Sequence, residues 1–256
     1  MIHESVIIDP SAKIADNVEI GAYSVIDKNV CISEGTVIKE NVIIRENTTI
    51  GKNNLIYQFA TIGEKPQDLK FQNEKTKCTI GDNNTFREYC SIHRGTSDGI
   101  SDTIIGDGNL FMAYTHVAHD CIIKNNCILS NGASLAGHVH LDSFVSLGGF
   151  TLVHQFCHIG EYAFSGLGTV ISQDVTPYTL VAGNHAKAYK INSVGLKRKG
   201  FDSESIINLE KTFKLFVKSK KTKEDREQIY KDSKLSNQYT EKFVKFILES
   251  ERGITR

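Results

Sequence analysis

Large aliphatic residues recur at every sixth position along the first two-thirds of the chain. Isoleucine occupies these positions without a break from Ile2 to Ile62, and after two interruptions the spacing continues from Ile105 to Ile171, with Ser165 the one polar residue. The fifth position of each unit is small or β-branched. A period of six fits neither the helical period nor the alternation of a long strand. We therefore expect a parallel β-helix, with one short strand and one turn per unit.

Three such units would close a triangular coil of about 18 residues, with neighbouring coils about 4.8 Å apart. The large and the small position of each unit then both face inward and stack on their counterparts. Four of the six cysteines occupy the small position, namely Cys90, Cys121, Cys127 and Cys157. We expect them to pack as small hydrophobic side chains and to take no part in thiol chemistry.

Two insertions interrupt the repeat, near residues 64–79 and 93–104, and both are expected to form loops. The repeat ends near residue 186, which predicts a β-helical domain over 1–186 and a helical domain over 187–256. A helical domain at this place would cover the strand edge at the end of the β-helix.

The C-terminal segment changes to a helical period after the N-cap candidates Asp202 and Ser203. One apolar face is formed by Ile206, Leu209, Phe213 and Phe216. A lysine-rich helix is expected from about Thr222, and another helix contains Tyr239, Phe243 and Ile247.

Charge is balanced overall but not along the chain. The totals are 30 Lys+Arg and 30 Asp+Glu, so no net field favours nucleic acid. Residues 187–256 hold 18 of the basic and 10 of the acidic residues, which leaves 12 and 20 for residues 1–186. The C-terminal part therefore suits an acidic partner. We find neither a signal peptide nor an apolar run long enough to span a membrane, and no CxxC pair, so we expect a reduced, cytoplasmic protein.

His119, Gly137 and Gln155 are 18 residues apart in sequence and should share one outward-facing column, with His138 and His154 beside it. This grouping suits acyl transfer. A histidine can act as general base, and a glycine amide one coil away can donate to an oxyanion. An acyl group that arrives on a thioester needs no serine or cysteine nucleophile.

A metal site is the main alternative at this column, since many histidines lie near it: His116, His119, His138, His140, His154 and His158. However, His116 and His119 occupy different positions of the repeat, and a flat β coil does not bring an i, i+3 pair together as a helix does. We therefore expect no metal. Polar turn histidines without any chemistry remain a second alternative.

Single repeats resemble the hexapeptide-repeat proteins, which implies a left-handed coil. A more specific resemblance is carried by an ordered set of segments: QFATIGEKPQDLK, SIHRGT, HVAHDC, LAGHV, VHQFC, GNHA and GLKRKGF. These occur in the order typical of the UDP-N-acetylglucosamine O-acyltransferase family and span nearly the whole chain.

The resemblance implies transfer of an (R)-3-hydroxyacyl chain from acyl carrier protein to the sugar 3-hydroxyl, the first step of lipid A biosynthesis. It also implies a homotrimer with its active sites in the clefts between subunits, where the first loop would meet the His119 edge across some distance. The acyl group arrives on the phosphopantetheine of acyl carrier protein, and no other cofactor is expected.

Carried over to this sequence, the resemblance implies that His119 is the general base, supported by Asp120, and that Gly137 supplies the oxyanion amide. Consecutive strand residues point to opposite faces, so Asp120 could instead act through its backbone or on another subunit. The implied substrate-binding residues are Gln67, Asp68, Lys70, His93, His116, His138, Gln155, Asn192, Arg198 and Lys199. Leu167 and His185 would line the acyl-chain pocket.

Three positions depart from the family pattern. Val194 replaces an acidic residue, and Lys199 replaces an arginine and so loses the planar two-pronged donor. Leu167 stands where long-chain members often have glycine, which predicts a shorter acyl chain. The basic residues after 186, including Lys187, Lys190, Lys197, Arg198 and Lys199, would offer acyl carrier protein a landing surface.

Other activities stay open on sequence alone. One is an N-acyltransferase, either the sibling enzyme acting later in the same pathway, whose members usually carry an extra N-terminal domain, or one that accepts a 3-amino UDP-sugar. Another is a metal-dependent hydratase resembling γ-class carbonic anhydrases, which bound zinc would reveal. A purely structural solenoid would explain neither the loops nor the histidine column.

Overall fold

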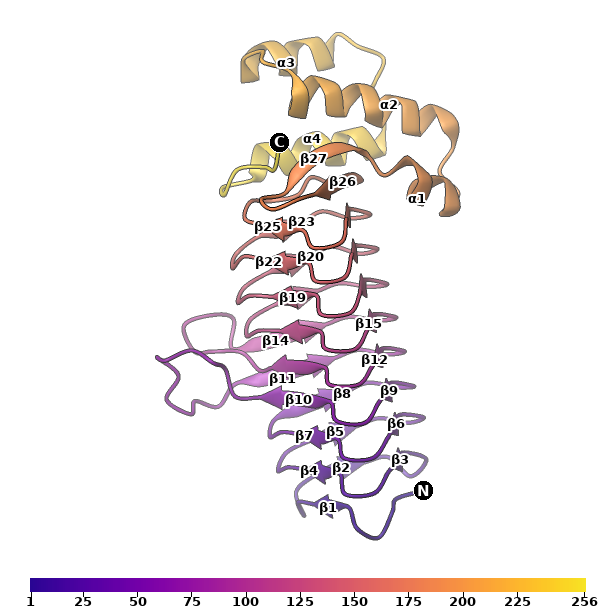
Figure 1. Ribbon diagram of the computed structural model, residues 1–256, viewed down its shortest axis with the longest axis vertical. Coiled ribbons are helices and arrows are strands. Elements are labelled where there is room, and N and C mark those ends of the chain that lie inside the picture. Colours follow the sequence, from indigo (N-terminus) through magenta and orange to yellow (C-terminus); the bar gives the residue numbers. More distant parts are fainter.

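The computed structural model describes the backbone of all 256 residues and the side chains of all but Lys223. Stacked triangular coils form a tall prism, and helices cover its C-terminal end (Figure 1). Its three walls are parallel sheets, named here sheets I, II and III in the order in which the chain enters them. The predicted fold class is confirmed: a mostly β protein, with a left-handed parallel β-helix followed by helices.

Sheet I contains β1 (Ile7–Ile8), β4 (Val25–Ile26), β7 (Ile43–Ile44), β10 (Thr61–Glu64), β13 (Ser91–His93), β16 (His116–Val117), β19 (Ser134–Leu135), β22 (Leu152–Val153) and β25 (Val170–Ile171). Sheet II contains β2 (Lys13–Ile14), β5 (Cys31–Ile32), β8 (Thr48–Ile50), β11 (Lys77–Ile80), β14 (Asp102–Ile105), β17 (Ile122–Ile123), β20 (His140–Leu141) and β23 (His158–Ile159). Sheet III contains β3 (Glu19–Ile20), β6 (Val37–Ile38), β9 (Leu55–Ile56), β12 (Thr85–Phe86), β15 (Leu110–Phe111), β18 (Ile128–Leu129), β21 (Ser146–Leu147), β24 (Phe164–Ser165), β26 (Thr179–Ala182) and β27 (Lys187–Ile191).

From Ile20 onward, the core of the prism consists of the residues that the six-residue period selects. Ile26 pairs with Ile8 on one side and Ile44 on the other, so equivalent residues stack from coil to coil. The four cysteines at small positions are buried, as predicted, and all six cysteines are free. Burial raises the pKa of the Cys121 thiol to about 12, so it remains protonated at neutral pH.

Turns at the three prism edges connect the sheets, and each edge is named here by the sheets that it joins. Many turn residues have positive φ, including Asn29 (58°), Asp120 (59°) and His138 (61°). Asparagine and aspartate tolerate this left-handed conformation better than most residues, which explains their frequency between the apolar positions.

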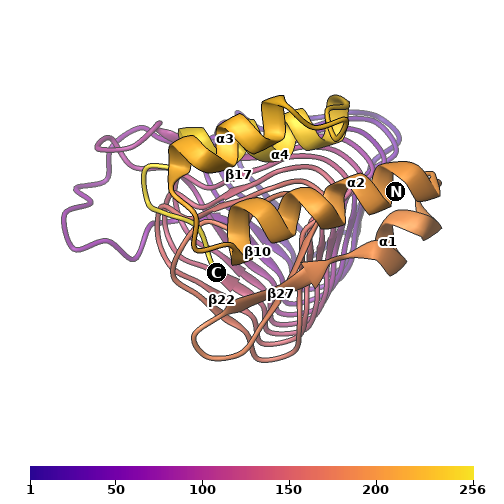
Figure 2. The same cartoon turned by 90° about the horizontal axis from the view of Figure 1, so that it is seen from above.

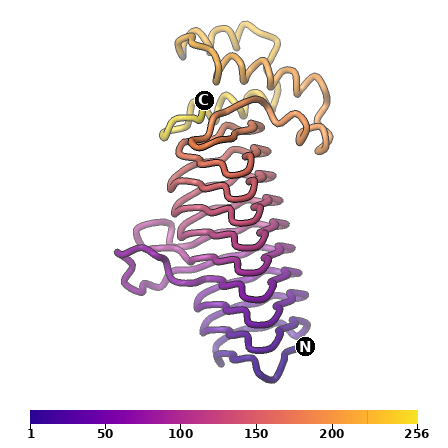
Figure 3. The backbone as a smooth tube through the Cα atoms, in the orientation of Figure 1, coloured from indigo at the N-terminus to yellow at the C-terminus, as the bar shows by residue number. Residues whose placement is uncertain are grey.

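Both predicted loops leave the prism at edge I–II. Residues 65–76 connect β10 to β11, and residues 94–101 connect β13 to β14. The trace in Figure 3 shows even coils interrupted only on this side, and the view along the prism in Figure 2 places the loops at one corner. His119 also lies at edge I–II, between β16 and β17.

At the C-terminal end, β27 turns back and pairs antiparallel with β26, and helices pack on this end. The helices are α1 (Ser193–Arg198), α2 (Ser203–Phe213), α3 (Lys223–Lys231) and α4 (Gln238–Glu249), with a π-helical segment at Lys214–Lys218. Asp202 caps α2, and its predicted apolar face is buried. The pattern predicted neither the β26–β27 hairpin nor α1, because both are too short to show a period. The division into domains at residue 186 stays a prediction.

Within the part of the chain that the structure describes, none of the helices has the length and apolar character needed to cross a bilayer.

Candidate active site

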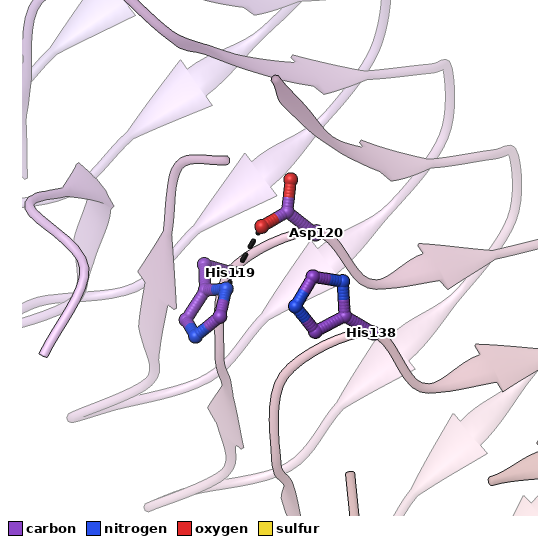
Figure 4. A group of neighbouring side chains, drawn as sticks. All are labelled: His119, Asp120 and His138. Carbon is purple, nitrogen blue, oxygen red and sulfur yellow. Dashed lines mark hydrogen bonds and ion pairs between the residues drawn. The ribbon is translucent and has the colours of Figure 1, made fainter. Parts of the chain in front are cut away.

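His119 and Asp120 form a hydrogen-bonded pair at edge I–II. The Nδ1 atom of His119 lies 2.8 Å from Oδ2 of Asp120, and Figure 4 shows the two side chains facing each other. Asp120 is buried, whereas 16% of the His119 side chain is exposed. The pair therefore presents an imidazole to solvent and hides the carboxylate behind it.

The Asp120 side chain contacts His119 within one chain, contrary to what strand alternation alone would give. That argument assumed a strand, but Asp120 lies in a corner turn with φ 59°, which rotates its side chain to the same side as His119. The second loop then fixes the carboxylate. Thr96 donates from its backbone N–H (3.1 Å) and from its hydroxyl (2.6 Å), and Thr103 accepts from the Asp120 N–H at 2.9 Å.

These contacts hold Asp120 ionised. Burial alone would raise its pKa, but the hydrogen bonds from His119 and Thr96 outweigh burial, and the pKa lies below its ordinary value. Sequence reasoning missed Thr96 and Thr103. Thr96 is the last residue of the SIHRGT segment, so this motif could have pointed to it. Nothing in the sequence, however, showed that Thr96 donates hydrogen bonds to Asp120.

The predicted column of His119, Gly137 and Gln155 is present on adjacent coils. The His138 N–H donates to the His119 carbonyl, and the Phe156 N–H donates to the Gly137 carbonyl. Among the residues that the structure describes, no backbone carbonyl accepts from the Gly137 N–H. Gln155 is exposed on the next coil. The column therefore brings an imidazole and a free amide donor together, although Gly137 itself is buried beneath the His119 ring and does not face outward as expected.

His138 lies beside this column. Its ring meets the His119 ring edge-on at 5.1 Å between centroids and stacks on Phe156 at 4.4 Å. Burial lowers the pKa of His138, while the charges of Asp120 and Asp68 oppose that shift. His138 is thus held by packing on both sides and is well placed to contact a ligand at His119.

His93 and His116 form a second histidine pair on sheet I, edge-on at 4.8 Å. The hydroxyl of Ser91 holds Nδ1 of His116 at 2.8 Å, whereas the buried Nδ1 of His93 has no partner within the described side chains. Burial, reinforced by His116 and opposed by Glu64, lowers the pKa of His93 to about 4. Its imidazole is therefore neutral at pH 7.

The first loop leaves the prism at the same edge as His119 within one chain. Both insertions follow sheet I strands, as the turn at His119 does. The sequence pattern did not show that they share an edge, because it did not assign each strand to a sheet. Gln67 and Lys70 are exposed, and Asp68 accepts from the Lys70 N–H at 2.9 Å. The charge of Asp68 opposes the lowering of the His138 pKa by burial.

Five of the predicted residues lie on the other two edges. Leu167 follows β24 at edge III–I, and His185 follows β26, next to Asn184, which bridges Val170 of sheet I. The Leu167 side chain is 78% exposed. A single chain thus keeps the predicted acyl-chain residues away from the His119 edge.

The predicted nucleotide residues gather at edge II–III. Asn192 donates to the Tyr162 carbonyl at 3.2 Å and caps α1 by accepting from the Gly195 N–H. The Lys199 ammonium lies 5.1 Å from the centre of the Phe144 ring. Arg198, at the end of α1, is exposed, as is Val194. These residues can meet the His119 edge only if it belongs to another copy of the chain.

His119, Asp120 and His138 also have the atoms for a cation, since one ligand atom from each lies within 4.8 Å of the others. The Asp120 carboxylate, however, already accepts from His119 and from both donors of Thr96. A metal here would have to break that network, so the geometry favours an oriented imidazole.

Comparisons with known proteins show the family to which the chain belongs. A family model described as UDP-N-acetylglucosamine O-acyltransferase, domain 2, matches residues 174–255, and one for bacterial transferase hexapeptide repeats matches residues 102–137. The curated acyl-[acyl-carrier-protein]–UDP-N-acetylglucosamine O-acyltransferase of Pseudomonas putida strain F1 is 46% identical over 98% of this chain and 97% of its own length. The corresponding protein of Halorhodospira halophila is 44% identical over 100% and 99%.

Solved structures agree equally well. The LpxA structure from Acinetobacter baumannii has a TM-score of 0.96 and 42% identity, and covers 100% of this chain and 99% of its own. LpxA from Bacteroides fragilis, a UDP-N-acetylglucosamine acyltransferase, has a TM-score of 0.97 and 38% identity over the whole of both chains. The chain described here therefore belongs to the UDP-N-acetylglucosamine O-acyltransferase family.

Proposed function

We propose that this protein transfers an (R)-3-hydroxyacyl chain from acyl carrier protein to the 3-hydroxyl of UDP-N-acetylglucosamine, the first step of lipid A biosynthesis. The observation that carries the proposal is the position of His119, whose ring is bonded to Asp120 on one side and packs against Gly137 on the other. A base and an oxyanion donor in contact are what acyl transfer to a hydroxyl requires.

The Asp120 carboxylate decides which nitrogen of His119 reacts. Because an ionised carboxylate only accepts hydrogen bonds, the Nδ1 atom facing it carries the proton. The lone pair is then on Nε2, which takes the proton of the sugar hydroxyl as its oxygen attacks the thioester carbon. Asp120 stabilises the imidazolium that forms, as in other oriented-histidine sites.

Gly137 acts on the tetrahedral intermediate. Its N–H donates to the negatively charged oxygen, a contact that gains strength only as charge develops. Collapse of the intermediate forms the ester and breaks the carbon–sulfur bond. The departing phosphopantetheine thiolate of acyl carrier protein receives the proton from His119 Nε2, which restores the neutral base. No other cofactor enters this sequence.

The complete site forms between copies of the chain, and we infer a homotrimer. Support comes from the distribution of residues over the three edges: the base and the first loop on edge I–II, Leu167 and His185 on edge III–I, and Arg198 with its neighbours on edge II–III. A neighbouring copy can place its own edge against edge I–II. Gln67, Asp68, Lys70, His93, His116, His138 and Gln155 would bind the sugar and phosphates, and Asn192, Arg198 and Lys199 the nucleotide.

Acyl carrier protein would dock on the basic C-terminal segment, where Lys187, Lys190, Lys197, Arg198 and Lys199 are exposed. We infer a cytoplasmic location, because all six cysteines are free and the thioester donor is a cytoplasmic carrier.

The test is acyl transfer from a series of 3-hydroxyacyl carrier proteins to UDP-N-acetylglucosamine. His119→Ala should lower kcat by about 10²–10⁴-fold, while His3→Ala, at an exposed histidine of the first coil, should leave it unchanged. Absence of transfer by the wild type, with transfer to a 3-amino UDP-sugar instead, would contradict the proposed acceptor. Full activity of His119→Ala would contradict the proposed base. The oligomeric state is tested separately by sedimentation equilibrium.

A further inference from the structure

A second cluster of histidine and aspartate side chains lies on the outer face of sheet II, away from the His119–Asp120 pair. His140 begins β20 and His158 begins β23, and these two residues are register partners on adjacent strands. Asp142 follows β20 and points outward beside them. One ligand atom from each of the three residues lies within 4.8 Å of the others. The catalytic proposal uses none of these residues.

The two imidazoles are arranged with their Nε2 atoms toward one carboxylate. The rings stack at 4.3 Å between centroids with 9° between their planes. His158 Nε2 lies 3.1 Å from Asp142 Oδ2, and His140 Nε2 lies 3.6 Å from Asp142 Oδ1. Two imidazole nitrogens and a carboxylate oxygen are the donors that first-row divalent metals such as zinc accept.

One atom in the cluster is left without a partner. His140 Nε2 is buried, has no hydrogen-bond partner among the side chains that the structure describes, and is too far from Asp142 for a hydrogen bond at 3.6 Å. A buried polar atom without a partner is costly and calls for an unseen one. A cation between His140, Asp142 and His158 would supply it.

A cation already occupies part of this position. The ammonium of Lys124, one coil below, lies 2.6 Å from Asp142 Oδ1. Its side chain is 51% exposed, so it can rotate into solvent without a change in the backbone. A divalent ion would replace this single charge on the carboxylate and would bond to both imidazoles as well.

Solvent reaches His158 from the side of the C-terminal helices. A cavity of about 510 Å³ borders His158 and is lined by Phe246 of α4 and by Glu249 and Glu251, with Arg252 as the opposing charge. Phe246 also packs on the His158 ring at 4.7 Å. An ion bound here would therefore be linked to both the coil stack and α4.

We propose that His140, Asp142 and His158 bind a divalent transition-metal cation, which joins the coils of β20 and β23 and stabilises the C-terminal end of the prism. The role is structural and is independent of acyl transfer at His119. Metal–nitrogen bonds are about 2.0–2.1 Å long and lie in the plane of the imidazole, so both rings must rotate out of their parallel stack for their Nε2 atoms to converge on one ion.

Zinc binding to the metal-stripped full-length protein provides the test, by titration calorimetry and by elemental analysis after gel filtration. We expect one Zn²⁺ per chain, a rise in Tm, and a loss of affinity of about tenfold or more in His140→Gln and in His158→Gln. His119→Ala, which removes the other histidine cluster, should bind zinc as the wild type does, and so should His3→Gln. Unchanged affinity in both His140→Gln and His158→Gln, or a loss confined to His119→Ala, would overturn the proposal.

A variant that binds zinc more tightly than the wild type cannot be explained by misfolding. Lys124→Met removes the competing ammonium while it keeps the length of the side chain, so zinc affinity should increase in this variant. Unchanged or weaker binding in Lys124→Met would contradict the assignment of Asp142 as a ligand. Acyl transfer by His158→Gln should match the wild type, which separates this site from the proposed catalytic one.

Discussion

The His119 ring lies directly over Gly137 of the next coil. A Cβ atom built on Gly137 would come within 2.7 Å of Cε1 and 2.8 Å of Nε2 of His119, closer than real atoms approach. The glycine therefore leaves space for the imidazole and also places a free N–H beside it. His119 and Gly137, which are 18 residues apart in sequence, are therefore in contact as the proposed base and the proposed oxyanion donor.

Gly137→Ala should consequently reduce catalysis far more than stability. The backbone of Gly137 does not have a positive φ, so alanine is tolerated there, but its methyl group must push the His119 ring off its position. We expect kcat to fall about 10²-fold or more with a small change in Tm. Steady-state kinetics and thermal unfolding measure the two effects. A variant with normal kcat would show that His119 need not lie over Gly137.

Thr96 is expected to act on catalysis through Asp120. Thr96→Val removes the hydroxyl that donates to Asp120 Oδ2 at 2.6 Å and keeps the backbone donor. Because the lost bond favours the ionised carboxylate, the pKa of Asp120 should rise, and its hold on the His119 Nδ1 proton should weaken. We expect a lower kcat with little change in KM.

The pH dependence of stability separates this role of Thr96 from a general loosening of the loop. A carboxyl group with a lowered folded-state pKa stabilises the protein above its unfolded pKa, and that stabilisation is lost as pH falls through the folded pKa. In Thr96→Val the loss should be smaller than in the wild type and should end at a higher pH, because the unfolded pKa at which it begins is the same. Thr96→Ser, which restores the hydroxyl, should return both kcat and the dependence of stability on acid pH toward the wild-type values.

His93 should make the protein less stable in mild acid. Its folded-state pKa of about 4 lies below the ordinary value of 6.5, so between these values only the unfolded chain binds the proton. Stability is therefore fully present above pH 6.5 and declines as pH falls toward 4, by up to about 3 kcal/mol for this group. Glu64 and His116 face His93 and are the charges that modify this value.

His93→Gln removes that titration. Chemical denaturation at pH 7 and pH 5 should show a smaller difference between the two pH values for the variant than for the wild type. Equal differences would mean that His93 is not kept neutral by burial. The histidine of the first coil, His3, is exposed, and His3→Gln is the matched control.

The sequence predicted those features that repeat. Ile26 pairs with Ile44 because identical side chains stack best one coil apart, and this fixes the register of every column, including that of His119. Corner conformations carry no such signal: φ at Asp120 decides that its carboxylate reaches His119. The hydrogen bond from Thr96 to Asp120 spans 24 residues across a loop without a period, so only the folded chain reveals it.

The sequence pattern also did not show which residues share an edge of the prism, although this follows from the strand order once the strands are assigned. An insertion after β10 and another after β13 fall on the same edge as the turn at His119, because all three follow sheet I strands. Leu167 follows a sheet III strand and therefore lies elsewhere. Knowledge of the period alone gives the columns, whereas the position of a residue around the triangle depends on counting every coil through both insertions.

Leu167 provides the last prediction, because it links chain-length preference to the arrangement of copies. Its side chain is exposed at edge III–I and lies over Gly149. A Cβ atom built on Gly149 would be 3.1 Å from Leu167 Cδ1. If this edge borders the acyl chain bound at a neighbouring copy, the leucine limits the depth available to the chain. Leu167→Gly should then shift the preferred 3-hydroxyacyl length upward by several carbons, with kcat retained for the longer donor.

The measurement is kcat/KM for Leu167→Gly against a series of 3-hydroxyacyl carrier proteins. Leu152, another exposed leucine (49%) but on sheet I, offers the control, and Leu152→Ala should keep the wild-type preference. An unchanged preference in Leu167→Gly would show that this edge does not border the acyl chain. Because Leu167 and His119 lie on different edges of one chain, a lengthened preference would also require that the two residues of one site come from different copies.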